Sequence, residues 1–264
     1  MNILDKIIAQ KQIEVAIAKE RTSIKNLESS EFFNRTTFSF KKHLNDKSKV
    51  GIIAEFKRKS PSKGIINATA DVQKTTNGYV NAGASALSIL TDPEFFGGKC
   101  EDVTAARKMN DCPILRKEFI IDEYQIIEAK SIGADVILLL ANVLNASHIK
   151  QYAKFAKSLG LEILLEVRDK DELKTVNEYV DAVGVNNRNL KDFNVNLSQS
   201  FDLVDLIPND FVKVSESGIS SAKTIHELKS VGFNGFLMGE TFMKQANPEL
   251  ACKNFINEVN AYNK

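Results

Sequence analysis

Short apolar runs recur along the chain from residue 51 to residue 240, and each run ends in polar residues. The runs are continuously apolar rather than alternating, which is typical of strands buried on both faces of a parallel sheet. Amphipathic stretches lie between them, with apolar residues at helical spacing. The pattern therefore predicts eight βα units, with strands within residues 51–57, 84–92, 112–119, 134–141, 161–167, 181–187, 210–217 and 234–240.

Residues that are typical of helix starts and helix ends lie between the apolar runs. Polar residues occupy the positions where helix N-caps are expected, namely Asp122, Asn145, Asp169 and Ser220 or Ser221. Glycines stand where helices should end, at Gly83, Gly133, Gly160 and Gly232. Apolar spacing predicts the helices themselves, as with Ile149, Tyr152, Ala153 and Ala156, with Leu173, Val176 and Val180, and with Ile225 and Leu228.

Eight βα units in one chain favour an α/β fold of the (β/α)8 TIM-barrel type. A doubly wound sheet is the alternative, but it would show fewer units and a glycine-rich first turn, and no GxGxxG follows any run. We therefore expect a single TIM-barrel domain over residues 1–264, with the barrel itself in residues 50–264 and an N-terminal helical extension in residues 1–45.

The extension begins with an amphipathic pattern, because Ile3, Leu4, Ile7 and Ile8 have helical spacing. Several phenylalanines follow between residues 32 and 40. We expect this segment to cover one end of the barrel. Two hypotheses for the extension stay open: it serves only to pack against the barrel, or it also takes part in the chemistry.

The amino-acid composition limits the classes of binding partner that we expect for this protein. The 35 basic and 34 acidic residues of the 264 are interspersed and give a net charge of +1, so nucleic acid is not an expected partner. No apolar run reaches membrane-spanning length, so no membrane contact is expected. The three cysteines are widely spaced, which suggests reduced thiols in the cytoplasm, and the three histidines lack metal-ligand spacing. We expect a cytoplasmic monomer without metal or cofactor.

Charged residues close several of the predicted strands, and barrel enzymes work at the carboxyl ends of their strands. Glu55 and Lys57 are two residues apart, so both side chains should point into the barrel. Lys117 and Glu166 close two further strands. Burying such charges is costly unless they are paired, so we predict a mouth in which carboxylates and ammonium groups tune one another's pKa.

The last two strands carry a different signal. Ser217 and Gly218 follow one of them, and Gly239 and Glu240 follow the other. Glycine lets the backbone approach a ligand closely, and the loops after strands 7 and 8 of a barrel are the usual phosphate site. A phosphorylated small molecule is therefore the expected ligand, and Ser60 in the loop after the first strand could add a hydroxyl.

These residues lie in segments that resemble indole-3-glycerol phosphate synthase. The segments are AEFKRKSPSKG (54–64), LRKEFIID (115–122), LLEV (164–167), GVNNRNL (184–190), VSESGI (214–219) and FLMGE (236–240). They stand in the same order as in that family, over residues 50 to 245, and the family also carries helices before its first strand. The resemblance implies the same barrel fold.

The resemblance also implies a reaction of tryptophan biosynthesis, in which 1-(2-carboxyphenylamino)-1-deoxyribulose 5-phosphate is cyclised to indole-3-glycerol phosphate with loss of CO₂ and water. Lys117 matches the family's general acid, and Lys57 is the candidate for a second acid. Glu166 or Glu55 can accept a proton from the ring. Which lysine and which glutamate act at each step stays open.

The same resemblance implies a set of substrate-binding residues. Asn186 and Arg188 bind near the ring, its carboxylate or the sugar hydroxyls, and Phe119 lines the pocket of the aromatic ring. Glu216 is a further ligand candidate. Residues expected around the rest of the substrate, chiefly its phosphate, are Ser60, Ser217, Gly218, Leu237, Gly239 and Glu240.

Three alternatives stay open. Phosphoribosylanthranilate isomerase would need a Cys/Asp pair at strand ends, and none of the cysteines ends a predicted strand. A Schiff-base aldolase barrel would use Lys57 or Lys117 as a nucleophile. An inactive barrel would bind a phosphorylated metabolite without turnover.

Overall fold

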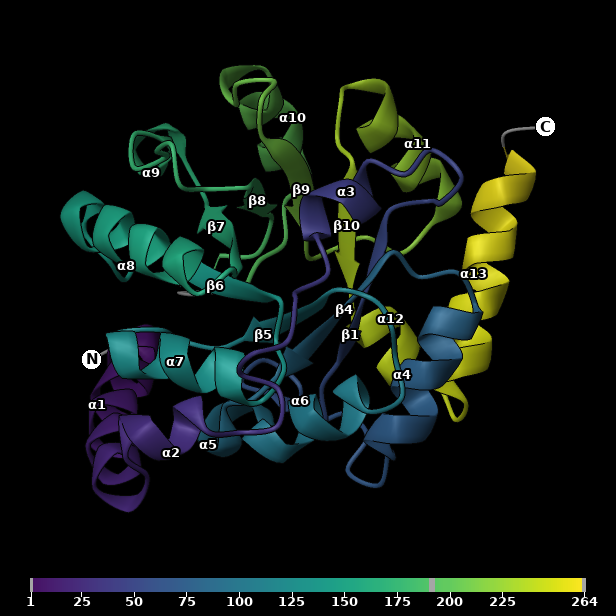
Figure 1. Ribbon diagram of the computed structural model, residues 1–264. Helices are drawn as coiled ribbons and strands as arrows, with labels where there is room; N and C mark the ends of the chain where they lie inside the picture. The colour runs from purple at the N-terminus through teal and green to yellow at the C-terminus, as the bar shows by residue number, and fades with distance from the viewer. Residues whose placement is uncertain (1, 190–192, 263–264) are drawn as a thin grey trace.

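A closed barrel of eight parallel strands forms the centre of the molecule (Figure 1). The computed structural model describes residues 2–189 and 193–262, so Leu190 of the GVNNRNL segment lies outside the described residues. The strand order around the barrel is β1-β10-β9-β8-β7-β6-β5-β4. All eight strand predictions are confirmed, by β1 (Ile52–Phe56), β4 (Ala86–Leu90), β5 (Ile114–Lys117), β6 (Val136–Leu140), β7 (Glu162–Val167), β8 (Ala182–Asn186), β9 (Val212–Glu216) and β10 (Gly235–Met238).

Helices follow the strands and pack around the barrel (Figure 1). Asp122, Asn145, Asp169 and Ser221 are N-caps whose side chains accept backbone hydrogen bonds, as predicted. The helices are α4 (Val72–Asn81), α5 (Pro93–Phe96), α6 (Cys100–Arg107), α7 (Glu123–Ser131), α8 (Ala146–Ser158), α9 (Lys170–Leu173), α10 (Ser198–Leu203), α11 (Ala222–Ser230), α12 (Glu240–Met243) and α13 (Pro248–Tyr262), with a 3₁₀ turn at Val204–Leu206.

The helix predicted over Leu173, Val176 and Val180 is wrong beyond its first turn. Helix α9 ends at Leu173, and turns follow. The side chain of Asn177 accepts a hydrogen bond from the backbone of Tyr179, and the Asn177 carbonyl accepts one from Val180. An asparagine that caps its own turn competes with helical hydrogen bonding, so the apolar spacing is filled by a non-helical segment.

Alternation along each strand divides the core into two parts. Even-numbered positions of β1 face the helices, whereas Ile53 belongs to a cluster inside the barrel with Leu115, Leu164 and Val214. Glu55 and Lys57 continue the inward set of β1, and Lys117 continues that of β5. The same period of two that buries the apolar residues therefore directs the strand-end charges into the mouth.

The N-terminal segment covers the barrel at both ends, not at the one end that was expected. Helix α3 (Phe40–Leu44) inserts Phe40 and Leu44 into the interior cluster at the amino ends of the strands. Glu162, the first residue of β7, holds this helix by accepting hydrogen bonds from Ser39 Oγ (2.6 Å) and Lys41 N (2.8 Å).

Helix α1 (Ile3–Arg21) lies near the opposite end, and α2 (Ile24–Glu28) packs against α7 (Figure 1). Ile7 of α1 is buried in the same interior cluster as Phe119, which follows β5. The extension therefore reaches the carboxyl ends of the strands, where the functional site was predicted.

Candidate active site

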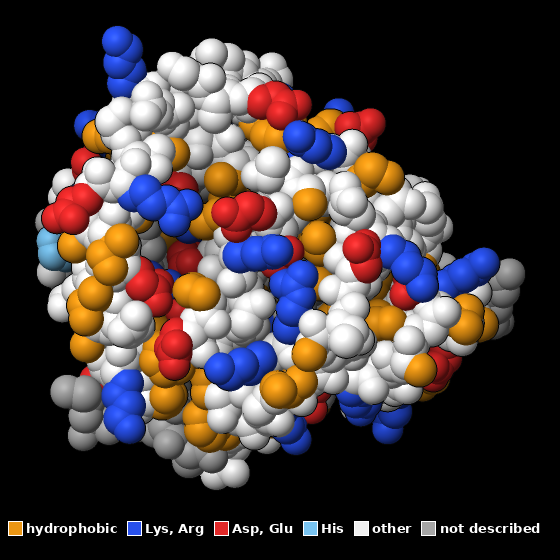
Figure 2. Space-filling model, turned by 90° about the horizontal axis from the view of Figure 1, so that it is seen from below, with side chains coloured by type: hydrophobic (Ala, Val, Ile, Leu, Met, Phe, Trp, Pro, Cys, Tyr) orange, Lys and Arg blue, Asp and Glu red, His pale blue; other side chains and the backbone are white. Residues whose placement is uncertain are grey.

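A cavity of about 530 Å³ opens at the carboxyl ends of the strands. Seen from that end, Lys, Arg, Asp and Glu side chains gather around a hollow with apolar side chains beside them (Figure 2). Every residue predicted for the site lines this cavity, namely Glu55, Lys57, Ser60, Lys117, Phe119, Glu166, Asn186, Arg188, Glu216, Ser217, Gly218, Leu237, Gly239 and Glu240.

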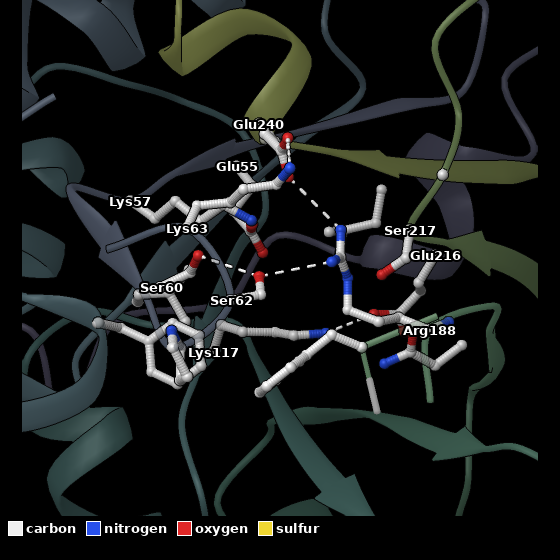
Figure 3. A pocket seen from close by; sticks show the side chains of 18 of the residues that line it. Glu55, Lys57, Ser60, Ser62, Lys63, Lys117, Arg188, Glu216, Ser217 and Glu240 are labelled. Atoms are coloured by element: carbon white, nitrogen blue, oxygen red, sulfur yellow. Dashed lines mark hydrogen bonds and ion pairs between the residues drawn. The ribbon is translucent and has the colours of Figure 1, made fainter. Parts of the chain in front are cut away.

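Lys117 lies at the centre of the charged part of the cavity (Figure 3). Its ammonium group forms ion pairs with Glu166, at 3.2 Å, and with Glu216. The three side chains come from β5, β7 and β9, which are not neighbours in the barrel. Glu216 was expected only as a substrate ligand, so its place in the central charge cluster is a finding of the tertiary structure.

Burial and charge shift the pKa values of this cluster in identifiable directions. Burial alone would lower the pKa of Lys117, but the carboxylates of Glu216 and Glu166 outweigh it and raise that pKa above its ordinary value. Burial raises the pKa of Glu216 to about 7, against the opposing effect of Lys117 and with the help of the nearby Glu166 charge. Lys117 is therefore held in its charged form, and Glu216 can exchange a proton near neutral pH.

A second lysine–glutamate pair lies beside the first. Lys57 Nζ is 2.7 Å from Glu55 Oε1, and Ser88 Oγ of β4 lies 3.5 Å from the other oxygen of Glu55. Both members of the pair come from the end of β1, as the spacing predicted. The mouth thus contains two separate ammonium–carboxylate units.

Two asparagines at the end of β8 hold the first cluster from different sides. Asn186 donates from Nδ2 to Glu166 Oε1 at 2.9 Å and accepts from the backbone of Arg188 at 3.0 Å. Asn187 points away from the cavity and donates to Ser215 Oγ, at 3.1 Å, and to the Glu216 carbonyl, at 3.0 Å. Asn186 therefore fixes the orientation of the Glu166 carboxylate, and Asn187, the residue after β8, holds the backbone at Glu216.

Two glycines leave room for the carboxylates. A Cβ at Gly184 would lie 2.3 Å from Glu216 Oε1, and one at Gly239 would lie 2.5 Å from Glu55 Oε1. Any other residue at these positions would displace the carboxylates. Gly184 stands inside a predicted strand, and a glycine in a strand interior is a signal of such a close approach.

The loops after β1, β8, β9 and β10 form the polar side of the cavity. Ser217 and Gly218 both have left-handed backbone angles, with φ of 68° and 78°. Arg188 lies 3.4 Å from Ser62 Oγ and 3.4 Å from the Glu240 carboxylate, which also lies 3.7 Å from Lys63 (Figure 3). Two cations and several small polar residues therefore converge where the phosphate was predicted.

The opposite side of the cavity is apolar. The rings of Phe96 and Phe119 lie 6.0 Å apart, and Leu138 and Leu140 of β6 continue this wall. Helix α1 completes it with Ile3, Leu4 and Ile7. An aromatic ring can pack on this side while a phosphate occupies the polar side.

Sequence reasoning missed part of this lining. Ser62 and Lys63 lie in the turn between two short antiparallel strands, β2 (Lys59–Ser60) and β3 (Gly64–Ile65), which are too short to leave a periodic pattern. The helical spacing of Ile3, Leu4 and Ile7 indicated a buried face, but did not indicate against what. Of the two other charges at the end of β5, Arg116 does not line the cavity and pairs with Glu128, whereas Glu118 lies in the cavity lining beside Phe119.

The arrangement suits proton transfer by side chains. Within residues 2–189 and 193–262, no group of His, Cys, Asp and Glu residues has an arrangement that could hold a metal ion. None of the three cysteines lines the cavity, and burial raises the pKa of each thiol to about 12, so a cysteine acid–base pair is not available there.

Comparison with known proteins agrees with this geometry. The family model of indole-3-glycerol phosphate synthase matches residues 4–255. The chain is 46% identical to the indole-3-glycerol phosphate synthase of Bacteroides thetaiotaomicron, over 98% of this chain and 99% of that protein. It is 42% identical to the Ruminiclostridium cellulolyticum enzyme of the same name, over 93% and 95%, and 39% identical to that of Campylobacter fetus, over 97% and 100%.

Solved structures share the fold. A chain of the tryptophan synthase complex of Pyrococcus furiosus superposes with a TM-score of 0.60 at 17% identity, over 81% of this chain and 98% of that one. The 3-hexulose-6-phosphate synthase of Salmonella typhimurium superposes with a TM-score of 0.59 at 12% identity, over 80% and 99%. At these identities the likeness concerns the fold alone.

Proposed function

The chain belongs to the indole-3-glycerol phosphate synthase family, and we propose that its two lysine–carboxylate units divide the acid–base steps of that reaction between them. The reaction converts 1-(2-carboxyphenylamino)-1-deoxyribulose 5-phosphate to indole-3-glycerol phosphate, CO₂ and water. A carbon–carbon bond forms, the carboxyl group leaves, and a hydroxyl group is eliminated. Each unit supplies an acid and a base within one cavity.

Lys117 is the acid of ring closure in this proposal. The ring carbon that bears the carboxylate attacks the ketone, and the ketone oxygen takes a proton from the Lys117 ammonium group. The C–CO₂ bond then breaks, and its electrons restore the aromatic ring. The raised pKa of Lys117 supports this role, because it keeps the group charged when substrate arrives.

Lys57 and a carboxylate complete the dehydration. The new hydroxyl leaves as water with a proton from Lys57, while a glutamate removes a proton from the adjacent carbon of the new five-membered ring. Glu166 is our candidate for this base, because Asn186 fixes one of its oxygens at 2.9 Å and Lys117 contacts the other. Glu55 then serves to position and recharge Lys57, its partner at 2.7 Å.

The two sides of the cavity give the substrate its orientation. We place the aromatic ring against Phe119 and the phosphate near Ser60, Ser217, Gly218, Gly239 and Glu240, with Leu237 beneath the sugar chain. Arg188 lies between the two sides and can contact the substrate carboxylate or the sugar hydroxyls. The reacting carbons would then lie over the Lys117 cluster.

The observation that carries the proposal is the ion pairing of Lys117 with two carboxylates on non-adjacent strands, inside a cavity that is apolar on one side and polar on the other. It also disfavours a Schiff-base mechanism. A nucleophilic lysine needs a lowered pKa, whereas that of Lys117 is raised.

The deciding experiment incubates the protein with the carboxyphenylamino-deoxyribulose phosphate and follows indole fluorescence. We expect turnover by the parent chain, and a loss of about 10²-fold or more in kcat for Lys117→Ala with phosphate affinity retained, since a general acid contributes this much. Lys223→Ala, whose exposed side chain lies on α11 outside the cavity, is the control and should behave as the parent chain. If the parent chain is folded and binds phosphate but forms no product, the proposed activity is contradicted and the chain would only bind a phosphorylated ligand.

We also propose that the enzyme works as a monomer in the cytoplasm. The cavity is lined by side chains of one chain, so a second copy is not needed to complete it. Of the helices in the described part of the chain, none has the length and apolar character that a membrane span requires. Light scattering at micromolar concentration tests the monomer, and a mass of two or more chains would contradict it.

A further inference from the structure

We propose that Lys11 of helix α1 is a positioning residue for the apolar side of the cavity, because its buried ammonium group connects this helix to the backbone that carries Phe96 and Phe119. The inference rests on the proposed function only in assigning the aromatic ring of the substrate to that side. Lys11 is 2% exposed and does not line the cavity itself.

The ammonium group of Lys11 contacts three carboxylates. It lies 3.0 Å from Asp92, 3.0 Å from Glu118 and 2.6 Å from Glu14 of its own helix. The side chains of Asp92 and Glu118 are almost fully buried, whereas that of Glu14 is partly exposed. Burial alone would lower the pKa of Lys11, but Glu118 and Asp92 outweigh it and raise that pKa, so the group stays charged.

Each buried carboxylate also holds the backbone of an aromatic residue of the cavity wall. Asp92 accepts hydrogen bonds from the backbone N–H groups of Phe95 (2.7 Å) and Phe96 (3.2 Å). Glu118 accepts one from the backbone N–H of Phe119 at 2.8 Å. Two hydrogen-bonded paths therefore lead from one ammonium group to the two rings that lie 6.0 Å apart in the cavity.

The helix that bears Lys11 provides the remaining apolar wall. Ile7 is one turn before Lys11 on the same face of α1, and Ile3 and Leu4 lie one further turn toward its start. A displacement of α1 would therefore move these residues away from the two rings. A buried ion pair is weak evidence for stability by itself, since apolar replacements are often as stable, so its geometric consequence is the more informative feature.

The test compares Lys11→Met with Lys19→Met. Lys19 lies on the same helix and pairs with Asp122 at 2.7 Å, but it is exposed and contacts neither Asp92 nor Glu118. Binding of 2-aminobenzoate, which fits the apolar side, is measured by its intrinsic fluorescence, and binding of inorganic phosphate is measured separately by the rise that it causes in the unfolding midpoint. We expect about tenfold weaker 2-aminobenzoate binding for Lys11→Met, less than about twofold change in phosphate binding, and no change of either for Lys19→Met.

Removing one partner of a buried pair can unfold a protein, so a second variant is included. Lys11→Met combined with Glu118→Gln removes one charge of each sign and keeps an acceptor for the Phe119 N–H. If either variant is folded by circular dichroism and binds 2-aminobenzoate as the parent chain does, the proposal is overturned. An equal loss of phosphate binding would also overturn it, because it would indicate general disruption.

The outcome is separable from that of the proposed function. Failure of the parent chain to convert the carboxyphenylamino-deoxyribulose phosphate would remove the proposed reaction, while the aminobenzoate and phosphate measurements would still decide the role of Lys11. In an active enzyme, Lys11→Arg should recover most of the lost kcat/KM, because it restores the cation that both carboxylates need.

Discussion

Gly184 determines where one of the carboxylates of the cavity can lie. Its missing side chain leaves the space that Glu216 Oε1 occupies, and Glu216 cannot simply turn aside because it is buried and paired with Lys117. Gly239 does the same for Glu55. A glycine can therefore act in a site through the volume that it leaves empty.

Gly184→Ala should reduce kcat/KM by about 10²-fold, since a displacement of about 1 Å in a catalytic group costs this much. Gly235→Ala is the matched control, because a Cβ there would meet only the apolar side chains of Val214, Leu44 and Ile53, at 3.0–3.3 Å. Both variants should lose about 1–3 kcal/mol of unfolding free energy through overpacking. Steady-state kinetics beside urea unfolding checks the distinction, which equal activity losses would contradict.

Glu216 gives the protein a pH dependence with a definite sign. Its folded-state pKa of about 7 lies above the ordinary value of 4.5, so the folded protein binds this proton more tightly than the unfolded chain. The corresponding stability is present below pH 4.5 and is lost as the pH rises toward 7. It amounts to a few kcal/mol, because each pKa unit corresponds to about 1.4 kcal/mol.

The variant Glu216→Gln should remove this dependence. The unfolding free energy of the parent chain minus that of the variant should fall between pH 4.5 and 7 and then level off. Urea unfolding at several pH values measures it. Phe201→Ala, which changes no ionisable group, should give a difference that does not change over this range, and a flat difference for Glu216→Gln would refute the assignment.

At the scale of elements, α3 stabilises the barrel from the end opposite the cavity. Phe40 is fully buried among the inward residues at the amino ends of the strands. The helix is short, and its position is held by Glu162 through hydrogen bonds to Ser39 and Lys41. Its contribution should therefore concern stability and leave the chemistry unaffected.

Phe40→Ala should cost about 3–5 kcal/mol of unfolding free energy, as is typical of a buried phenylalanine that leaves a cavity. The kcat of the fraction that stays folded should be close to that of the parent chain. Phe201→Ala, at a position of α10 that is 37% exposed, should cost little. A large fall in kcat for folded Phe40→Ala would mean that the two ends of the barrel are coupled.

The elements also show where sequence patterns fail. Continuous apolar runs identified all eight strands, because each strand is buried on both faces and its run is long enough to detect. The helix predicted through Val176 and Val180 fails because Asn177 forms a local turn with its own side chain. The two-residue strands β2 and β3 are too short for any period.

At the scale of the whole molecule, the phosphate side of the cavity joins the beginning and the end of the barrel. Ser60 and Lys63 follow β1, whereas Ser217 and Gly239 follow β9 and β10, and β1 pairs with β10 where the barrel closes. A ligand that contacts both loops can bind only when the barrel is closed. Its binding free energy therefore adds to the free energy of unfolding.

Inorganic phosphate should accordingly raise the unfolding midpoint of the parent chain. At a concentration of about 100 times Kd the stabilisation should reach about 2.7 kcal/mol. Thermal unfolding in phosphate and in chloride of equal ionic strength measures it. The variant Ser217→Ala combined with Gly218→Ala should lose the phosphate-specific part, and an equal effect of chloride would contradict a specific site.

The sequence by itself determined the fold class, the eight strands and many of the residues that line the cavity. It could do so because burial on both faces, the period of two and the strand-end charges are all local properties of the chain. The tertiary structure alone decided which charges pair. Lys117 and Glu216 are 99 residues apart and come from strands on different sides of the barrel, so no local pattern joins them.

The same holds for the N-terminal extension. Its helical spacing is visible in the sequence, but its partners are not, and only the packed molecule brings Lys11 to Asp92 and Glu118 and places Ile3, Leu4 and Ile7 in the cavity. An amphipathic pattern shows that one face of the helix must be buried, because the exposure of its apolar side chains to water is unfavourable. What covers that face depends on contacts between residues far apart in the chain, which form only when the barrel closes.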